Sequence, residues 1–64
     1  MSISMKAARV NANLNLEEAA KAIGVTKNTL IGYESGKVSP RVDTAKKMAD
    51  VYGMPIENIN FYAE

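Results

Sequence analysis

Three stretches of this chain begin in the way that starts an α-helix, and this recurrence limits the fold more than any other feature. Each has a Ser, Asn or Thr whose side-chain oxygen can accept a hydrogen bond from a helical N–H. Each also has an apolar residue just before that cap and another five positions further on, the hydrophobic staple that fixes the entry angle of a helix. The three sets are Ile3-Ser4 with Ala8, Leu14-Asn15 with Ala19, and Val25-Thr26 with Leu30. No alternating apolar run competes with them, so we expect an all-α domain.

The spacing of apolar residues, together with the cap residues, glycines and prolines between them, predicts five short helices in one domain over 1–64. They are expected at about 5–12, 16–23, 27–35 and 42–52, with a fifth carrying Ile56 and Ile59 after Pro55. Glycines close the second, third and fourth helices. The tail over 60–64 is expected to be irregular, with Phe61 covering the core. The residues predicted to face inward are Met5, Ala8, Ala12, Ala19, Ala20, Ile23, Thr26, Thr29, Leu30, Tyr33, Val42, Ala45, Met48, Ala49 and Tyr52.

Composition excludes several kinds of chemistry. The 64 residues include no cysteine and no histidine, which excludes disulfide scaffolds, zinc fingers, thiol catalysis and histidine acid–base chemistry. No apolar run approaches the roughly 20 residues of a membrane span, and the first residues lack a signal peptide. We therefore expect a cytoplasmic protein that is not an enzyme, with no cofactor, no metal, no membrane association and no evident small-molecule substrate.

Charge is distributed unevenly along the chain. Residues 1–47 hold all eight Lys and Arg against four acids, whereas residues 48–64 hold three acids and no base. A basic body with an acidic end is compatible with binding a polyanion on one side, and equally with a mixed solvated surface.

The second and third predicted helices are separated only by Gly24, Val25 and Thr26. A turn of this length that contains glycine holds two helices at a steep angle, which indicates a helix-turn-helix at about 16–35. Ala20 is small where the helices would cross, and Leu30 would anchor the second of them. An ordinary helical hairpin, in which the same glycine serves as a C-cap, is the alternative.

The third predicted helix has an unusual outer face. A merely solvated face normally carries charged residues, but this one has Lys27, Asn28, Ile31, Gly32 and Ser35. Lys can donate to guanine, Asn can pair with adenine, and Ile can touch a thymine methyl in the major groove. Gly32 would permit close approach to the duplex. The alternative is a poorly optimised surface.

Residues 15–30 read Asn-Leu-Glu-Glu-Ala-Ala-Lys-Ala-Ile-Gly-Val-Thr-Lys-Asn-Thr-Leu and are followed by Tyr33-Glu34-Ser35-Gly36-Lys37 and Ser39-Pro40. With Arg9, these motifs resemble the lambda-repressor/Cro (XRE) family of helix-turn-helix proteins over about residues 5–59. The resemblance implies a sequence-specific regulator of transcription, of the phage or prophage repressor or Cro-like type. It would bind double-stranded DNA and read the major groove with the third helix.

The resemblance also implies roles for individual residues. Arg9 and Glu34 would form an ion pair between the first and third helices. Bases would be read by Lys27, Asn28, Ile31 and Gly32. Phosphates would be met by Arg9, Asn15, Thr26, Ser35, Lys37, Ser39 and Arg41. Leu16, Gly32 and Arg41 depart from the usual pattern: they replace a Gln, a longer polar residue and a small capping residue.

Two further hypotheses concern partners. With no separate dimerisation domain expected, a homodimer would have to form through the domain itself, by way of Val51, Met54, Pro55, Ile56, Phe61 and Tyr62. The alternative function is a protein-interaction module, an antitoxin or antirepressor built on the same fold, which the exposed Ile31 and the acidic end would suit.

Overall fold

All three predicted caps begin an α-helix in the computed structural model, which describes residues 2–61. They start α1 (Met5–Asn11), α2 (Leu16–Ile23) and α3 (Lys27–Ser35). Ser4 Oγ accepts from the Ala7 amide at 3.0 Å, and Thr26 Oγ1 accepts from the Thr29 amide at 3.2 Å. At α2 the cap is reciprocal, because Asn15 Oδ1 accepts from the Glu18 amide and Glu18 Oε1 accepts from the Asn15 amide. Local side-chain chemistry therefore sets the start of each helix.

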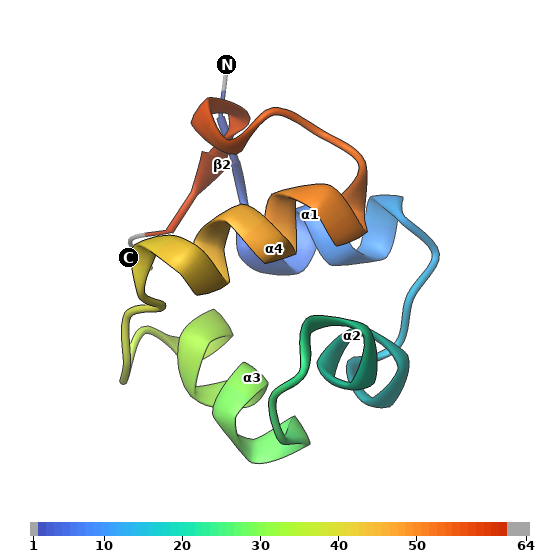
Figure 1. The fold of residues 1–64 in the computed structure, drawn as a ribbon, viewed down its shortest axis with the longest axis vertical. Helices are drawn as coiled ribbons and strands as arrows, with labels where there is room; N and C mark the ends of the chain where they lie inside the picture. Colours follow the sequence, from blue (N-terminus) through green and yellow to red (C-terminus); the bar gives the residue numbers. More distant parts are fainter. Residues whose placement is uncertain (1, 62–64) are drawn as a thin grey trace.

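The fourth helix, α4 (Val42–Tyr52), begins without such help. Its N-cap residue Arg41 makes no side-chain capping hydrogen bond, and a first-turn amide, that of Thr44, donates instead to Asp43 Oδ1 at 3.0 Å. α2, α3 and α4 end as predicted, each at a glycine with positive φ. In Figure 1, α4 crosses the molecule in front of α1, with α2 and α3 below them.

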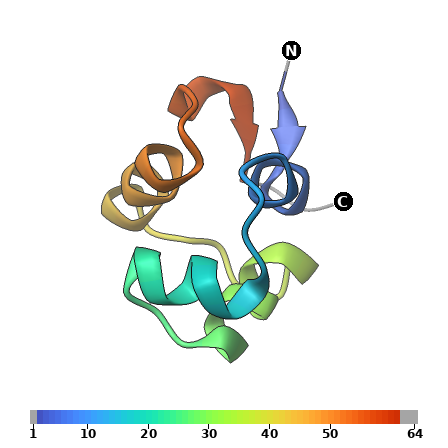
Figure 2. The same cartoon turned by 90° about the vertical axis from the view of Figure 1, so that its right-hand side faces the viewer.

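The segment predicted as a fifth helix is a single 3-10 turn, η1 (Ile56–Asn58). It is followed by β2 (Ile59–Asn60), which pairs in parallel with β1 (Ile3–Ser4) so that Ile3 lies opposite Ile59. Figure 2 shows the two strands side by side. The domain is otherwise helical, as predicted, but Ile59 reaches the core from a strand rather than from a helix. A two-residue strand is too short for alternation to reveal it.

The core lies between the four helices and the strand pair, and alanine and methionine make up much of it. Its buried hydrophobic cluster comprises Met5, Ala8, Ala19, Ala20, Ile23, Leu30, Tyr33, Met48, Ala49, Tyr52 and Ile59. Phe61 packs against this cluster, which supports the expected covering role.

Four of the predicted inward positions differ. Val42 is 72% exposed, because α4 first meets the core one turn later, at Ala45. Thr26 is exposed as a cap, and Ala12 and Thr29 are only half-buried.

Residues 2–61 contain no helix with the length and apolar character needed to cross a bilayer. Over the same residues, no group of acidic side chains is placed to hold a metal ion.

Candidate nucleic-acid interface

A tight turn sets α3 against α2. The amides of Gly24 and Val25 both donate to the carbonyl of Ala20, at 2.8 and 3.0 Å. Gly24 adopts φ 91°, a left-handed conformation that side chains with a Cβ rarely accept. Ala20 is buried, and Leu30 is fully enclosed where α3 packs on α2. This is helix-turn-helix geometry, with α3 fixed as the second helix (Figure 1).

The outer face of α3 is presented to solvent. Leu30 and Tyr33 are buried, whereas Lys27, Asn28, Ile31 and Ser35 are exposed. The predicted division of the helix into a core side and an open side is therefore present. Ile31, a large aliphatic side chain, is 42% exposed on this face.

Gly32 does not lie fully open on this face. It is half-buried, because the side chain of Val38 folds over it. A Cβ at position 32 would lie 3.6 Å from Val38 Cγ2. The expected close approach of the α3 backbone to a duplex is consequently limited on the side that Val38 covers.

Lys27 has a neighbour that its sequence position does not reveal. Its Nζ lies 3.6 Å from Oε1 of Glu17 at the start of α2, and both side chains are well exposed. Asn15, Leu16, Glu17 and Lys27 line a shallow pocket of about 290 Å³ there. An exposed pair of this kind contributes about 0–1 kcal/mol, so Lys27 can leave Glu17 for another partner at little cost.

Arg9 and Glu34 form the ion pair that ties α1 to the end of α3. Arg9 Nε donates to Glu34 Oε2 at 2.7 Å, and Nη2 donates to Oε1 at 3.3 Å. Nη1 donates to the carbonyl of Leu14 at 2.9 Å. Arg9 is only 8% exposed, and the hydrogen bond to Glu34 raises its pKa. The Arg9 guanidinium is thus occupied by contacts within the chain that join α1 to α3 and to the carbonyl of Leu14.

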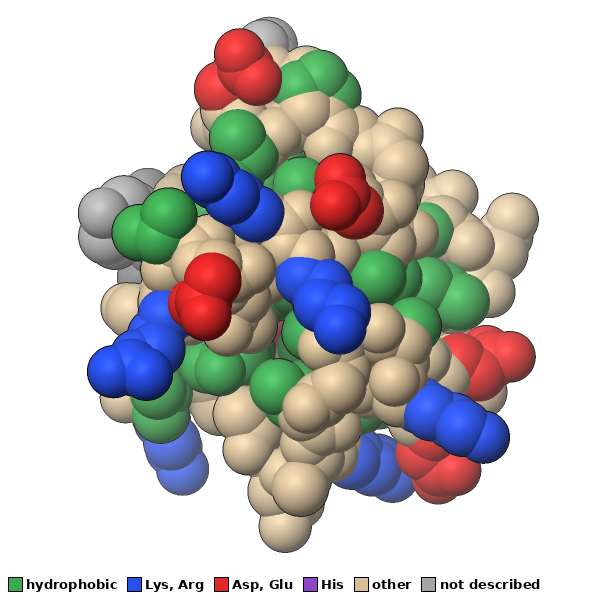
Figure 3. Space-filling model, viewed as in Figure 1, with side chains coloured by type: hydrophobic (Ala, Val, Ile, Leu, Met, Phe, Trp, Pro, Cys, Tyr) green, Lys and Arg blue, Asp and Glu red, His purple; other side chains and the backbone are tan. Residues whose placement is uncertain are grey.

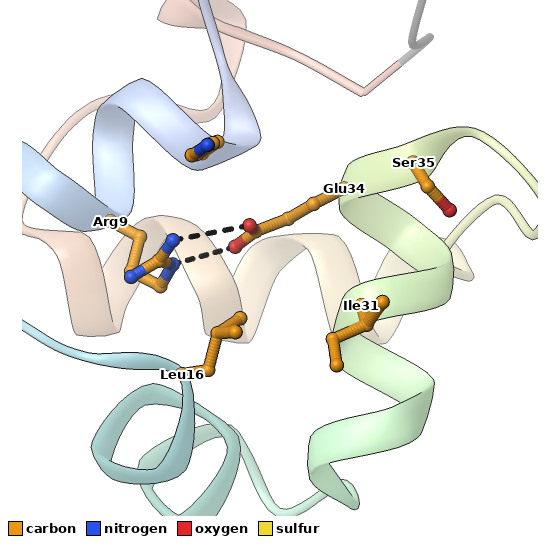
Figure 4. Close-up of a pocket in the computed structure, with 6 residues that line it drawn as sticks. Arg9, Leu16, Ile31, Glu34 and Ser35 are labelled. Atoms are coloured by element: carbon orange, nitrogen blue, oxygen red, sulfur yellow. Dashed lines mark hydrogen bonds and ion pairs between the residues drawn. The ribbon is translucent and has the colours of Figure 1, made fainter.

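Below this ion pair lies a pocket of about 380 Å³ (Figure 4). Leu16 and Ile31 face each other across it from α2 and α3, and Ser35 lies further along α3. Lys6 completes the lining. Sequence reasoning did not identify Lys6, because only the packing of α1 against α3 brings it to this side.

Tyr52 lies beside the ion pair with its hydroxyl buried. Within residues 2–61, that hydroxyl has no hydrogen-bond partner. Burial, and secondarily the Glu34 carboxylate, raise the pKa of Tyr52 from 10.0 to about 12.

Stability should therefore fall at high pH because of Tyr52. The unfolded chain ionises this phenol near pH 10, whereas the folded protein holds it neutral until about pH 12. Its contribution is complete below pH 10 and is lost as the pH rises toward 12, at about 1.4 kcal/mol per pH unit. Tyr52→Phe should lower this dependence while leaving stability at pH 7 unchanged or slightly higher, as urea denaturation from pH 7 to 11.5 would measure. Equal alkaline losses in both proteins would contradict the assignment.

The residues predicted to meet phosphates fall into two groups. Asn15, Thr26 and Ser35 are exposed, but each already makes a local hydrogen bond: Asn15 and Thr26 as caps, and Ser35 from its Oγ to the Gly32 carbonyl. Lys37, Ser39 and Arg41 are exposed on the loop between α3 and α4. Figure 3 shows basic side chains along the lower left of the molecule, beside this loop, with acidic ones interspersed.

Comparison with known proteins agrees with this geometry. The sequence model of a family described as helix-turn-helix matches residues 5–59. The cryptic phage CTXphi transcriptional repressor of Vibrio cholerae is 49% identical over 51 residues, covering 80% of this chain and 46% of that protein. An uncharacterized helix-turn-helix-type transcriptional regulator of Methanocaldococcus jannaschii is 38% identical over 64 residues, covering all of this chain and 97% of that protein. Another, from Archaeoglobus fulgidus, is 36% identical over 64 residues and is covered to 90%. This chain thus spans about half of the Vibrio repressor and nearly all of the two archaeal proteins. No solved structure matches it.

Proposed function

We propose that this chain, which belongs to the helix-turn-helix family, regulates transcription by reading the major groove of double-stranded DNA with α3. The observation that carries the proposal is the outer face of α3. It is held rigidly by the turn and by Leu30, yet it presents Lys27, Asn28 and Ile31 rather than a charged solvated surface. The relatives named as transcriptional regulators support this role and the expectation that the chain is not an enzyme.

Base recognition in this proposal belongs to the first two turns of α3. Lys27 leaves Glu17 and donates to a guanine, and Asn28 pairs with an adenine. Ile31 contacts a thymine methyl. Gly32 contributes no side chain, and its uncovered side allows the helix to lie close to the base edges.

Phosphate contacts fix the register of the domain on the duplex. We assign them to Lys37, Ser39 and Arg41 on the loop after α3, which make no side-chain bonds within residues 2–61 of the kind that occupy the caps. Asn15, Thr26 and Ser35 are assigned weaker contacts, because their side-chain oxygens already serve α2 and α3. Arg9 is left out of the set because it is buried against Glu34.

A homodimer is the assembly that we propose on DNA, with two α3 helices reading half-sites about 34 Å apart. Pro55 and Ile56 are exposed and available for such a contact, whereas Val51, Met54 and Phe61 pack partly against the core of their own chain. Tyr62 lies outside the described residues. Because its target is the DNA of the cell, we also propose that the protein acts in the cytoplasm.

Selection of duplexes from a random pool, at defined salt, tests the function directly. We expect an enriched site with two-fold symmetry, bound at least a thousandfold more tightly than unselected DNA. Equal affinity for selected and random duplexes would refute sequence-specific reading. Co-purification of a stoichiometric protein partner without any salt-dependent DNA binding would instead favour a protein-interaction module.

Two lysines should respond differently to substitution. Lys27→Ala is expected to relax the preference at one base pair, with a loss of about 1–3 kcal/mol against the selected base. Lys37→Ala should weaken selected and random DNA about equally and should lower the slope of log K against log[salt] by about one. Anisotropy titrations at several salt concentrations measure both effects. A uniform loss from Lys27→Ala would show that Lys27 contacts only the backbone.

A further inference from the structure

Gly32 and Val38 lie side by side on the face of α3. The amides of Lys37 and Val38 donate to the carbonyl of Gly32, at 3.0 and 3.2 Å, which folds the loop after α3 back onto the helix. The isopropyl group of Val38 consequently lies beside residue 32, with Cγ2 at 3.6 Å and Cβ at 4.0 Å from where a Cβ of that residue would be. Val38 thus lies in van der Waals contact with the place where a side chain at position 32 would begin.

Val38 is not part of the hydrophobic core. It is 54% exposed and is absent from the buried cluster and from the hydrophobics that pack against it. Ile31, the residue before Gly32, is also exposed. We refer to Ile31 and Val38 as the aliphatic pair. They flank the one position on this face that lacks a side chain, and neither can donate or accept a side-chain hydrogen bond.

An aliphatic pair of this kind matches one feature of the major groove. Base edges there present donors, acceptors and a single apolar group, the 5-methyl of a pyrimidine. We infer that Val38, reaching in from the loop, is a specificity residue that contacts a pyrimidine 5-methyl group in place of the side chain that Gly32 lacks. Ile31 contacts a second such methyl. The inference rests on the proposed function, since it requires α3 to lie in the groove.

The methyl can be removed from the DNA without altering any hydrogen-bonding group. In a selected duplex, each thymine is replaced in turn by deoxyuridine, and each cytosine in turn by 5-methyldeoxycytidine. Burial of one methyl corresponds to about a fourfold change in affinity. Wild-type protein should lose about this much at two thymines of each half-site, and Val38→Ala should abolish the effect at one of them while keeping it at the other. Ile31→Ala should show the reverse.

Val42→Ala is the matched control, because Val42 is also an exposed valine, and it lies at the start of α4, outside the aliphatic pair. It should retain the wild-type dependence at both thymines. Tighter binding of a methylated cytosine by wild type, lost in Val38→Ala, would also support the inference and identify methylcytosine as the source of the methyl. A Val38→Ala protein with the full wild-type pattern would overturn the inference while leaving the proposed function intact. Equal binding of selected and random DNA by wild type would overturn both.

Discussion

Glu34→Ala is expected to leave most of the protein unfolded at 25 °C. The substitution removes both carboxylate acceptors of the Arg9 guanidinium, which is only 8% exposed and would keep the Leu14 carbonyl as its remaining partner. Removing one partner of a buried pair costs about 3–5 kcal/mol. A core of this size rarely supplies more than about 3–5 kcal/mol in total. Far-UV circular dichroism with urea denaturation measures the loss.

Two controls separate this effect from a general loss of charge. Glu17→Ala breaks the exposed pair with Lys27 and should change stability by less than about 1 kcal/mol. The double variant Arg9→Met with Glu34→Leu removes both charges together, and it should recover most of the stability that Glu34→Ala loses. A Glu34→Ala protein that melts at the wild-type temperature would show that the pair contributes nothing to folding.

Leu30→Ala should be comparably severe. Leu30 is completely buried where α3 packs on α2, so truncation removes apolar contacts and leaves a cavity, at a cost of about 2–5 kcal/mol. We expect a protein that is largely unfolded alone but is partly rescued by saturating selected DNA, because a ligand that binds only the folded state stabilises it. Thermal melts with and without the duplex measure both effects.

The neighbouring residue provides a matched control for this experiment. Ile31→Ala changes a residue of similar size on the exposed side of the same helix and should alter stability by no more than about 0.5 kcal/mol. Equal destabilisation by the two substitutions would mean that the outer face of α3 is not open to solvent. The proposed reading of DNA would fall with it.

Much of this fold could be predicted from the sequence because its determinants are local. Ser4, Asn15 and Thr26 start helices through bonds that span three residues, and the glycines after α2 and α3 end them. The same locality places Lys27 and Asn28 on the open side of α3, since helical periodicity is sufficient to separate them from Leu30.

The remaining features depend on contacts between distant segments. Two of these contacts cannot be recognised from the spacing of residue types along the sequence. They are the pairing of Ile3 with Ile59 and the contact of Lys27 with Glu17. Val38 could not be identified from the sequence for a related reason, because a lone valine in a loop carries no pattern. The Arg9–Glu34 pair was expected only through the resemblance to a family, because no local signal connects two charges on separate helices.

The strand pair has a consequence for how the molecule assembles. Joining Ile3 to Ile59 closes nearly the entire described chain into one loop, which carries a larger chain-entropy cost than any contact inside α2 and α3. We therefore expect α2 and α3, whose contacts join neighbours in sequence, to form early, and the pairing of the two ends to form late. Folding thus proceeds outward from α2 and α3. The surface proposed to read DNA therefore depends least on the slow pairing of β1 with β2.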